Sequence, residues 1–133
     1  MSHMQMLLPY RKKGSQIQYL VKNAYVPGWD QHPDLCGISV LGNDPNQEEI
    51  MLENLAKEAG IVIREDELIR LGVCAIKRSS DLVCNMFAVD LSKRLDEAVA
   101  TSPDYFWIND DKMMESIDPQ LLSCYAKLRY LVL

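Results

Sequence analysis

The residues of this chain best suited to chemistry lie in one acidic segment, residues 47–59, which carries Glu48, Glu49, Glu53 and Glu58. On an α-helix, side chains three and four positions apart share a face. Carboxylates that share a face can hold magnesium, a hard cation that takes oxygen ligands and polarises phosphoryl oxygens. Lys57 stands beside Glu58, and its ammonium would repel a divalent cation. Lys57 could instead pair with Glu53, four residues earlier, and this face would then be an ordinary solvated surface.

A helix over residues 47–59 would position these acids. Its apolar residues Ile50, Met51, Leu55 and Ala59 follow helical spacing and trace one face. Gly60 follows them as a C-cap, and the polar cluster before residue 47 offers capping side chains at the other end. The sequence therefore predicts one amphipathic helix here.

Strands outnumber the helices that could connect them elsewhere in the chain. The alternation of Ile17, Tyr19 and Val21 with polar residues predicts a half-buried strand, and a Gly-containing turn joins it in a hairpin to the strand before it. Helices are expected over residues 110–116 and after Asp118 and Pro119. This order predicts an α+β fold, a mixed sheet with helices packed on its faces. The expected strands are residues 5–10, 17–23, 36–41, 68–77, 82–89 and 105–108, of which the two around residues 78–81 form a second hairpin.

Length and composition indicate one globular domain. The chain has 133 residues, of which 48% are hydrophobic and 25% charged, as in ordinary globular proteins. We expect the domain to span residues 5–133 and set residues 1–4 aside as a cloning remnant. The net charge of −5 supplies no basic field for a nucleic-acid backbone, so no nucleic-acid partner is expected.

Cysteine usage and hydropathy predict a cytoplasmic protein. The four cysteines, Cys36, Cys74, Cys84 and Cys124, form no Cys-x-x-Cys pair, and three of them lie in apolar runs. The expectation is therefore reduced core thiols. No stretch of the sequence is long and apolar enough to span a bilayer, and no basic segment with an apolar core begins it. We accordingly expect no membrane association and no secretion.

The segment from Glu48 to Ile61 resembles the catalytic box of the Nudix hydrolase family. The order of elements from about residue 6 onward, with Phe106-Trp107-Ile108 before an Asn-capped helix, is also similar to the layout of that family. The resemblance implies an α/β/α sandwich and a magnesium-dependent hydrolase of nucleoside diphosphate-linked substrates. It also implies a small nucleotide-like ligand, and a homodimer is one expectation because many family members form dimers.

Placed position by position, the box has lost most of its acids. Glu53 falls where the family has arginine, and Asn54 falls where the next glutamate stands. The adjacent pair of family glutamates falls on Lys57 and Glu58, whereas Gly60 matches the family glycine. Glu58 is therefore the predicted catalytic residue and the surviving metal ligand.

Other residues could complete such a site. Glu49 and Asp44, near the start of the helix, are the candidate helpers of Glu58 in holding a metal. Gly42 is the candidate for the opening glycine of the box and thus for ligand binding. Trp29 lies in a Pro-Gly loop, where function concentrates, and could contact a ligand through its ring.

Two main functions follow, and a third concerns assembly. The chain is either a Nudix-like hydrolase with a degenerate metal box, using Mg²⁺ if it is active, or an inactive Nudix-fold module. The module would bind a nucleotide-like ligand or a protein partner and would need no cofactor. The third is a structural role for the apolar tail at residues 130–133. The replaced ligands predict little stabilisation by magnesium and weak or absent turnover.

Overall fold

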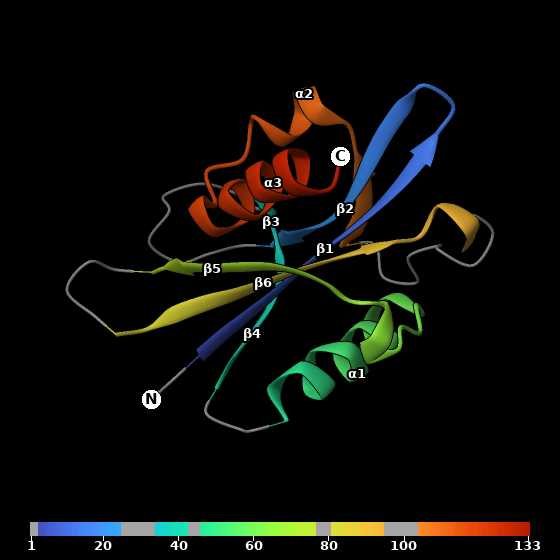
Figure 1. The fold of residues 1–133 in the computed structure, drawn as a ribbon. Helices are drawn as coiled ribbons and strands as arrows, with labels where there is room; N and C mark the ends of the chain where they lie inside the picture. The colour runs from blue at the N-terminus through green and yellow to red at the C-terminus, as the bar shows by residue number, and fades with distance from the viewer. Residues whose placement is uncertain (1–2, 25–33, 43–45, 77–80, 95–103) are drawn as a thin grey trace.

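The computed structural model describes residues 3–24, 34–42, 46–76, 81–94 and 104–133. Within these ranges the chain forms a seven-stranded mixed sheet with helices on both faces. In Figure 1, helices α2 (Asp110–Met113) and α3 (Pro119–Leu131) lie above the sheet and helix α1 (Gln47–Ala59) lies below it. The predicted α+β sandwich is therefore confirmed.

The elements follow the predicted order. Two short 3-10 turns, Glu65–Glu67 and Ser92–Arg94, flank the hairpin of β5 (Ile69–Ala75) and β6 (Val83–Asp90). The strands are β1 (His3–Lys13), β2 (Gln16–Ala24), β3 (Asp34–Cys36), β4 (Ile38–Gly42), β5 (Ile69–Ala75), β6 (Val83–Asp90) and β7 (Tyr105–Ile108). The helices are α1 (Gln47–Ala59), α2 (Asp110–Met113) and α3 (Pro119–Leu131). Of these helices within the described ranges, none has the length and apolar character that a bilayer crossing requires.

β1 is the central strand, and its partner on one edge changes along its length. Residues 3–10 pair in parallel with β6 on the other edge. Residues 10–13 pair antiparallel with β2, whereas residues 3–7 pair antiparallel with β4. β1 and β2 therefore separate beyond the Tyr10–Tyr19 pair, and β4 takes the place of β2. Both predicted hairpins, β1–β2 and β5–β6, are confirmed.

Two hydrophobic cores lie on the two faces of the sheet, because the side chains of β1 alternate between them. Met6, Leu8 and Tyr10 join the core beneath α3, and Leu7 joins the core above α1. Each helix closes its core with one apolar face. The buried residues are Leu121, Cys124 and Leu128 on α3, and Met51, Leu52, Leu55 and Ala59 on α1.

The helices begin and end at the capping residues. α1 spans the predicted residues 47–59 and is followed by Gly60, whose φ of 71° lies in the left-handed region that favours glycine. Asn109 caps α2 by accepting a hydrogen bond from the backbone N–H of Lys112 at 2.9 Å. α2 ends at Met113, earlier than the predicted residue 116, because the backbone then tightens: Glu115 N–H donates to Lys112 O and Ser116 N–H donates to Met113 O.

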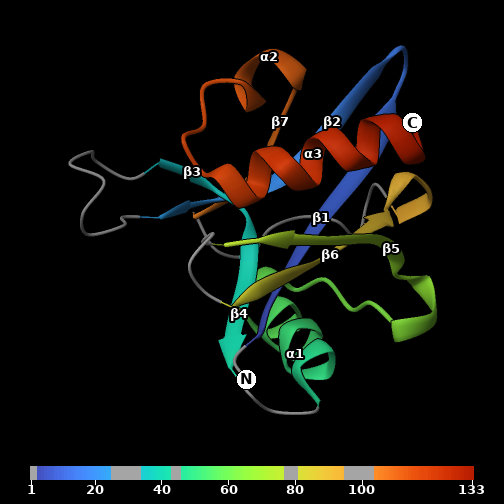
Figure 2. The ribbon, with the colours of Figure 1, turned by 60° about the vertical axis from the view of Figure 1, so that its left-hand side comes forward.

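Asp118 caps α3 and also ties that helix to the sheet. Its Oδ1 accepts hydrogen bonds from the N–H groups of Gln120 and Leu121 at 3.1 and 3.2 Å. Its Oδ2 accepts a hydrogen bond from the N–H of Gly37 at 3.0 Å. Figure 2 shows β4 running from the N-terminal end of α3 toward α1. One carboxylate therefore joins the start of α3 to the junction of β3 and β4.

Most strand boundaries differ from the expectations by a few residues, and two of the differences affect the strands around the junction of β1 and β4. The single strand predicted over residues 36–41 is divided at Gly37 into β3 and β4. Gly37 is tightly packed, because a Cβ there would lie 2.7 Å from the Cε atom of Met6. β1 begins at His3, so that His3 and Met4, which were set aside with residues 1–4, pair with β4 and β6.

Asp118→Ala is expected to lower the free energy of unfolding by about 2–4 kcal/mol, since it removes a helix cap and leaves the buried Gly37 N–H without its acceptor. Urea denaturation followed by circular dichroism measures this change. Asn109→Ala, which removes the more exposed cap of α2, is the control and is expected to cost about 1 kcal/mol. Equal losses in the two variants would contradict the role assigned to the Gly37 contact.

Candidate functional site

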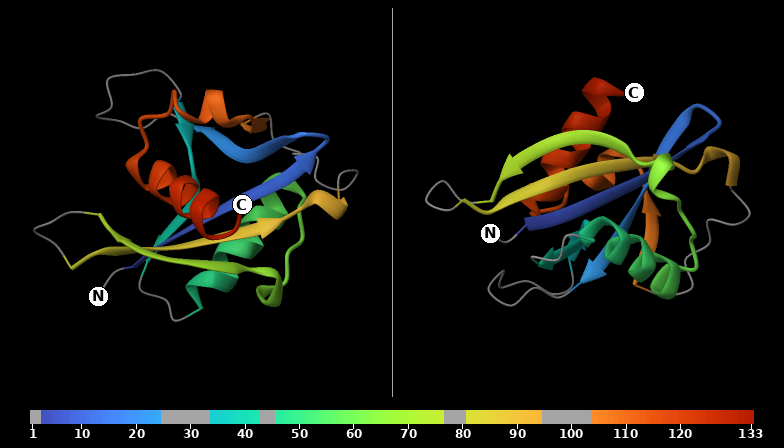
Figure 3. Two further views of the ribbon diagram at one scale, coloured as in Figure 1. Left: turned by 45° about the horizontal axis from the view of Figure 1, so that its top comes forward. Right: turned by 60° about the horizontal axis from the view of Figure 1, so that its bottom comes forward.

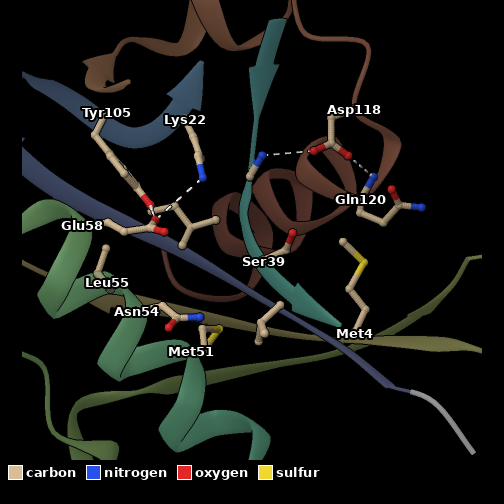
Figure 4. Close-up of a pocket in the computed structure, with 13 residues that line it drawn as sticks. Met4, Lys22, Ser39, Met51, Asn54, Leu55, Glu58, Tyr105, Asp118 and Gln120 are labelled. Atoms are coloured by element: carbon tan, nitrogen blue, oxygen red, sulfur yellow. Dashed lines mark hydrogen bonds and ion pairs between the residues drawn. The ribbon is translucent and has the colours of Figure 1, made fainter. Parts of the chain in front are cut away.

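A cavity of about 350 Å³ opens where β1 and β2 separate. β4 forms its floor, α1 forms one wall, and the first turn of α3 lies at the opposite end, as Figure 4 shows. Its lining mixes apolar, amide and charged side chains. The lining residues are Met4, Lys22, Gly37, Ile38, Ser39, Val40, Met51, Asn54, Leu55, Glu58, Tyr105, Asp118 and Gln120.

The sheet register brings two polar side chains to the α1 side of this cavity. β2, after leaving β1, pairs antiparallel with β7, and Lys22 lies directly opposite Tyr105. Directly opposed residues of antiparallel strands point to the same face. Lys22 and Tyr105 therefore both reach toward the C-terminal half of α1.

α1 turns only part of its acidic surface toward the cavity. Met51 and Leu55 pack into the core, and Asn54 and Glu58, one turn apart, line the cavity beside them. Glu49 and Glu53 instead line a separate surface cavity between α1 and the segment that follows it. The acids of this helix are thus divided between two surfaces.

Glu58 contacts both Lys22 and Tyr105, the two side chains that the pairing of β2 with β7 places beside it. The ammonium of Lys22 lies 3.7 Å from Glu58 Oε2, and the Tyr105 hydroxyl donates a hydrogen bond to the same oxygen. Burial and the Glu58 carboxylate raise the pKa of Tyr105 above its usual range, so this hydroxyl keeps its proton. The ion pair remains open to solvent, because the Lys22 and Glu58 side chains are 35% and 49% exposed.

The described residues do not suit a magnesium ion. Magnesium prefers several oxygen ligands in near-octahedral geometry, and the described ranges hold no group of three acids, histidines or cysteines placed to bind a metal. Glu58 already faces an ammonium, which opposes a dication at that position. The other cavity carboxylate, Asp118, uses both oxygens for backbone N–H groups. The donor set therefore fits an internal ion pair better than a metal centre.

The structure separates most of the site residues proposed from the sequence. Glu58 and Asn54 reach the cavity, whereas Glu53 and Glu49, a proposed metal ligand, lie on the other surface. Lys57 is exposed and does not line the cavity. The described ion pairs include none between Lys57 and Glu53.

The remaining proposed residues have structural positions or lie outside the described ranges. Gly60 is the C-cap of α1. Gly42 ends β4 against the side chain of Gln47, where a Cβ would lie 2.9 Å from Oε1. Trp29 and Asp44 fall outside the described residues, so their proposed ligand and metal contacts stay predictions.

Sequence reasoning missed Lys22, Tyr105 and Gln120 as cavity residues. Lys22 and Tyr105 were placed on strands, but no local pattern indicated that these two strands pair with each other. Asp118 was predicted as a cap, which is confirmed, but not as a wall of the cavity. The missing information is strand register, which links residues distant in the sequence.

Glu58→Gln is expected to lower the pKa of Tyr105, because the neutral amide no longer opposes the negative phenolate. An alkaline titration followed by tyrosinate absorbance measures the shift, and Tyr105→Phe identifies which transition belongs to this residue. Glu53→Gln removes the same charge from the other surface of α1 and is expected to leave that transition in place. A Tyr105 transition at the same pH with Glu or Gln at position 58 would disprove the contact.

Comparisons with known proteins support the fold. No family model and no curated protein matches the sequence. Among solved structures, the C-terminal domain of mouse MUTYH, in complex with human PCNA, has a TM-score of 0.72 and 14% identity, with 97% of this chain and 88% of that chain covered. An Ap4A hydrolase from C. elegans has a TM-score of 0.68 and 15% identity over 98% of both chains. The NUDIX domain of Shewanella oneidensis NrtR, complexed with ADP ribose, has a TM-score of 0.71 and 12% identity, over 96% of this chain and 85% of that chain. The chain therefore has the fold of Nudix domains.

Proposed function

We propose that this chain is a Nudix-fold module that binds a nucleotide-like small molecule in the cavity without hydrolysing it through magnesium. Of the two functions that the sequence left open, the binding module agrees better with the residues at the site. The observation that carries the proposal is the contact of Lys22 with Glu58, the one box carboxylate that lines the cavity.

Lys22 is the one cationic side chain among the described residues that line the cavity. A side chain that is 35% exposed can contact a ligand as well as Glu58, since an ammonium has three donors. Phosphate oxygens are suitable acceptors for it, and such charge-assisted hydrogen bonds are stronger than neutral ones. The anionic part of a ligand would therefore lie at the Lys22 end, next to β2 and β7.

The rest of the cavity suits a flat heterocycle. Met4 and Val40, both partly exposed, offer polarisable and aliphatic surface, and thioethers make favourable contacts with aromatic rings. The amides of Asn54 and Gln120 can donate and accept hydrogen bonds at the edge of a base. A largely apolar pocket with a few polar groups is typical of small-molecule sites. The fold likeness to a domain solved with ADP ribose supports the same ligand class.

The test is calorimetric titration with ADP in the presence of EDTA, which removes divalent cations. We expect binding without a metal, and we expect Lys22→Met to weaken it by about tenfold, or about 1.4 kcal/mol, because the phosphate loses its charged partner. Lys57→Met removes the same charge from the exposed side of α1 and is expected to leave the affinity unchanged.

A second measurement separates this module from the hydrolase. Release of products from ADP-ribose or Ap4A is followed with magnesium present, with the wild-type chain and with Glu58→Gln. We expect no turnover above background in either protein and no rise in melting temperature with magnesium. Brisk magnesium-dependent hydrolysis that Glu58→Gln abolishes would refute the proposal in favour of the enzyme.

A further inference from the structure

Three cysteines, two from the β5–β6 hairpin and one from α3, gather in the core beneath α3. Cys84 on β6 and Cys124 on α3 are fully buried members of this core, and Cys74 on β5 packs against it while keeping partial exposure. Cys124 Sγ lies 3.8 Å from the carbonyl oxygen of Phe87. Neither the cavity nor the proposed ligand contacts involve any of these thiols.

Cys74 and Cys84 are direct cross-strand partners in the β5–β6 hairpin. Their side chains therefore point to the same face of the sheet. Ile76 N donates to Leu82 O two residues further along, and hydrogen-bonded pairs recur at every second position of an antiparallel ladder. The cysteines thus form a hydrogen-bonded pair, whose Cα atoms are about 5.5 Å apart, within the range of about 4.4–6.8 Å that a disulfide spans.

The geometry points to Cys74 and Cys84 as a redox modification site, which forms a cross-strand disulfide on reaction with a small-molecule disulfide such as oxidised glutathione. Cys74 is the entry point because it is the partly exposed thiol of the pair. Cys84 is the resolving residue because it lies opposite Cys74 and is closed off from solvent.

The reaction has two exchange steps. Cys74 Sγ, as the thiolate, attacks one sulfur of the reagent RSSR, an S–S bond to Cys74 forms, and RS⁻ leaves with the bonding electrons and takes up a proton. Cys84 then loses its proton, attacks the Cys74 sulfur and expels the second RS⁻. Overall, two protein thiols are oxidised by two electrons, and RSSR is reduced to two RSH that carry the protons lost by the cysteines.

The second step is expected to be slow. Burial, with the neighbouring Cys74, raises the pKa of the Cys84 thiol to about 12, so few molecules hold the attacking thiolate at neutral pH. Closure also draws the two Cβ atoms to about 3.8 Å, which requires β5 to shift. β5 is an edge strand, visible in yellow-green beyond β6 and β1 in the right-hand view of Figure 3, and its register is already irregular between Arg70 and Gly72.

The experiment treats the wild-type chain with oxidised glutathione, blocks the remaining thiols and digests the protein with trypsin without reduction. Lys77 and Arg78 lie between the two cysteines, so trypsin separates a peptide of residues 71–77 from one of residues 79–93. We expect mass spectrometry to find these two peptides joined, with the mass of two hydrogens lost. Reduction with dithiothreitol before digestion is expected to return them as separate peptides.

The variants identify each step. Cys84→Ala is expected to stop at the mixed disulfide, with glutathione retained on Cys74, whereas Cys124→Ala and Cys36→Ser are expected to close normally. A wild-type chain that keeps glutathione on Cys74 without joining the peptides would overturn the proposal. So would a disulfide from Cys84 to Cys124 in its place, and both results come from the wild-type protein, independent of how any variant folds.

Discussion

A single buried carboxylate holds the parts of this molecule in the arrangement that creates its cavity. Asp118 is 6% exposed, and its two oxygens accept hydrogen bonds from the first turn of α3 and from Gly37. Burying a charge is costly unless such partners satisfy it. The contact keeps Gly37 at the point where the chain passes from β3 to β4, and β4 can then pair with β1 where β2 has turned away. The space between the separated strands is the cavity.

The cation in contact with Glu58 is Lys22, which lies on strand β2 and not on helix α1. The sequence drew attention to Lys57, which directly precedes Glu58 in the box, but Lys57 is exposed and does not line the cavity. Lys22 reaches Glu58 because β2 pairs with β7 and places Lys22 opposite Tyr105. The proposal that a dication is disfavoured therefore rests on Lys22 rather than on Lys57, because Coulomb repulsion depends on distance in space and Lys22 is the cation next to Glu58.

Local sequence signals predicted the helices and strands. They could not predict which elements distant in the sequence pair or pack together. The limits of α1 followed from its apolar face and from Gly60, and the strand at residues 105–108 matches β7. The close packing of Gly37 on Met6 depends on the pairing of β4 with β1. The cluster of Cys74, Cys84 and Cys124 depends on the register of β5 and β6 and on the docking of α3. Such contacts are determined by tertiary packing, which a single sequence does not encode in its periodicity. For the same reason, the sequence did not indicate that Lys22 and Tyr105 lie together at the cavity.

The residues that build this fold and the residues that would carry metal chemistry are different sets, so a change in the second set does not require a change in the first. On α1, Leu55 and Ala59 are buried against the sheet, while Asn54, Lys57 and Glu58 are exposed. Substitutions at exposed helix positions usually change stability by less than about 0.5 kcal/mol, whereas loss of a buried leucine costs about 2–5 kcal/mol. Replacing acids at the exposed positions therefore leaves both cores intact. Such replacements would also leave the cavity in place, because its walls depend on β4, on Asp118 and on the separation of β1 from β2.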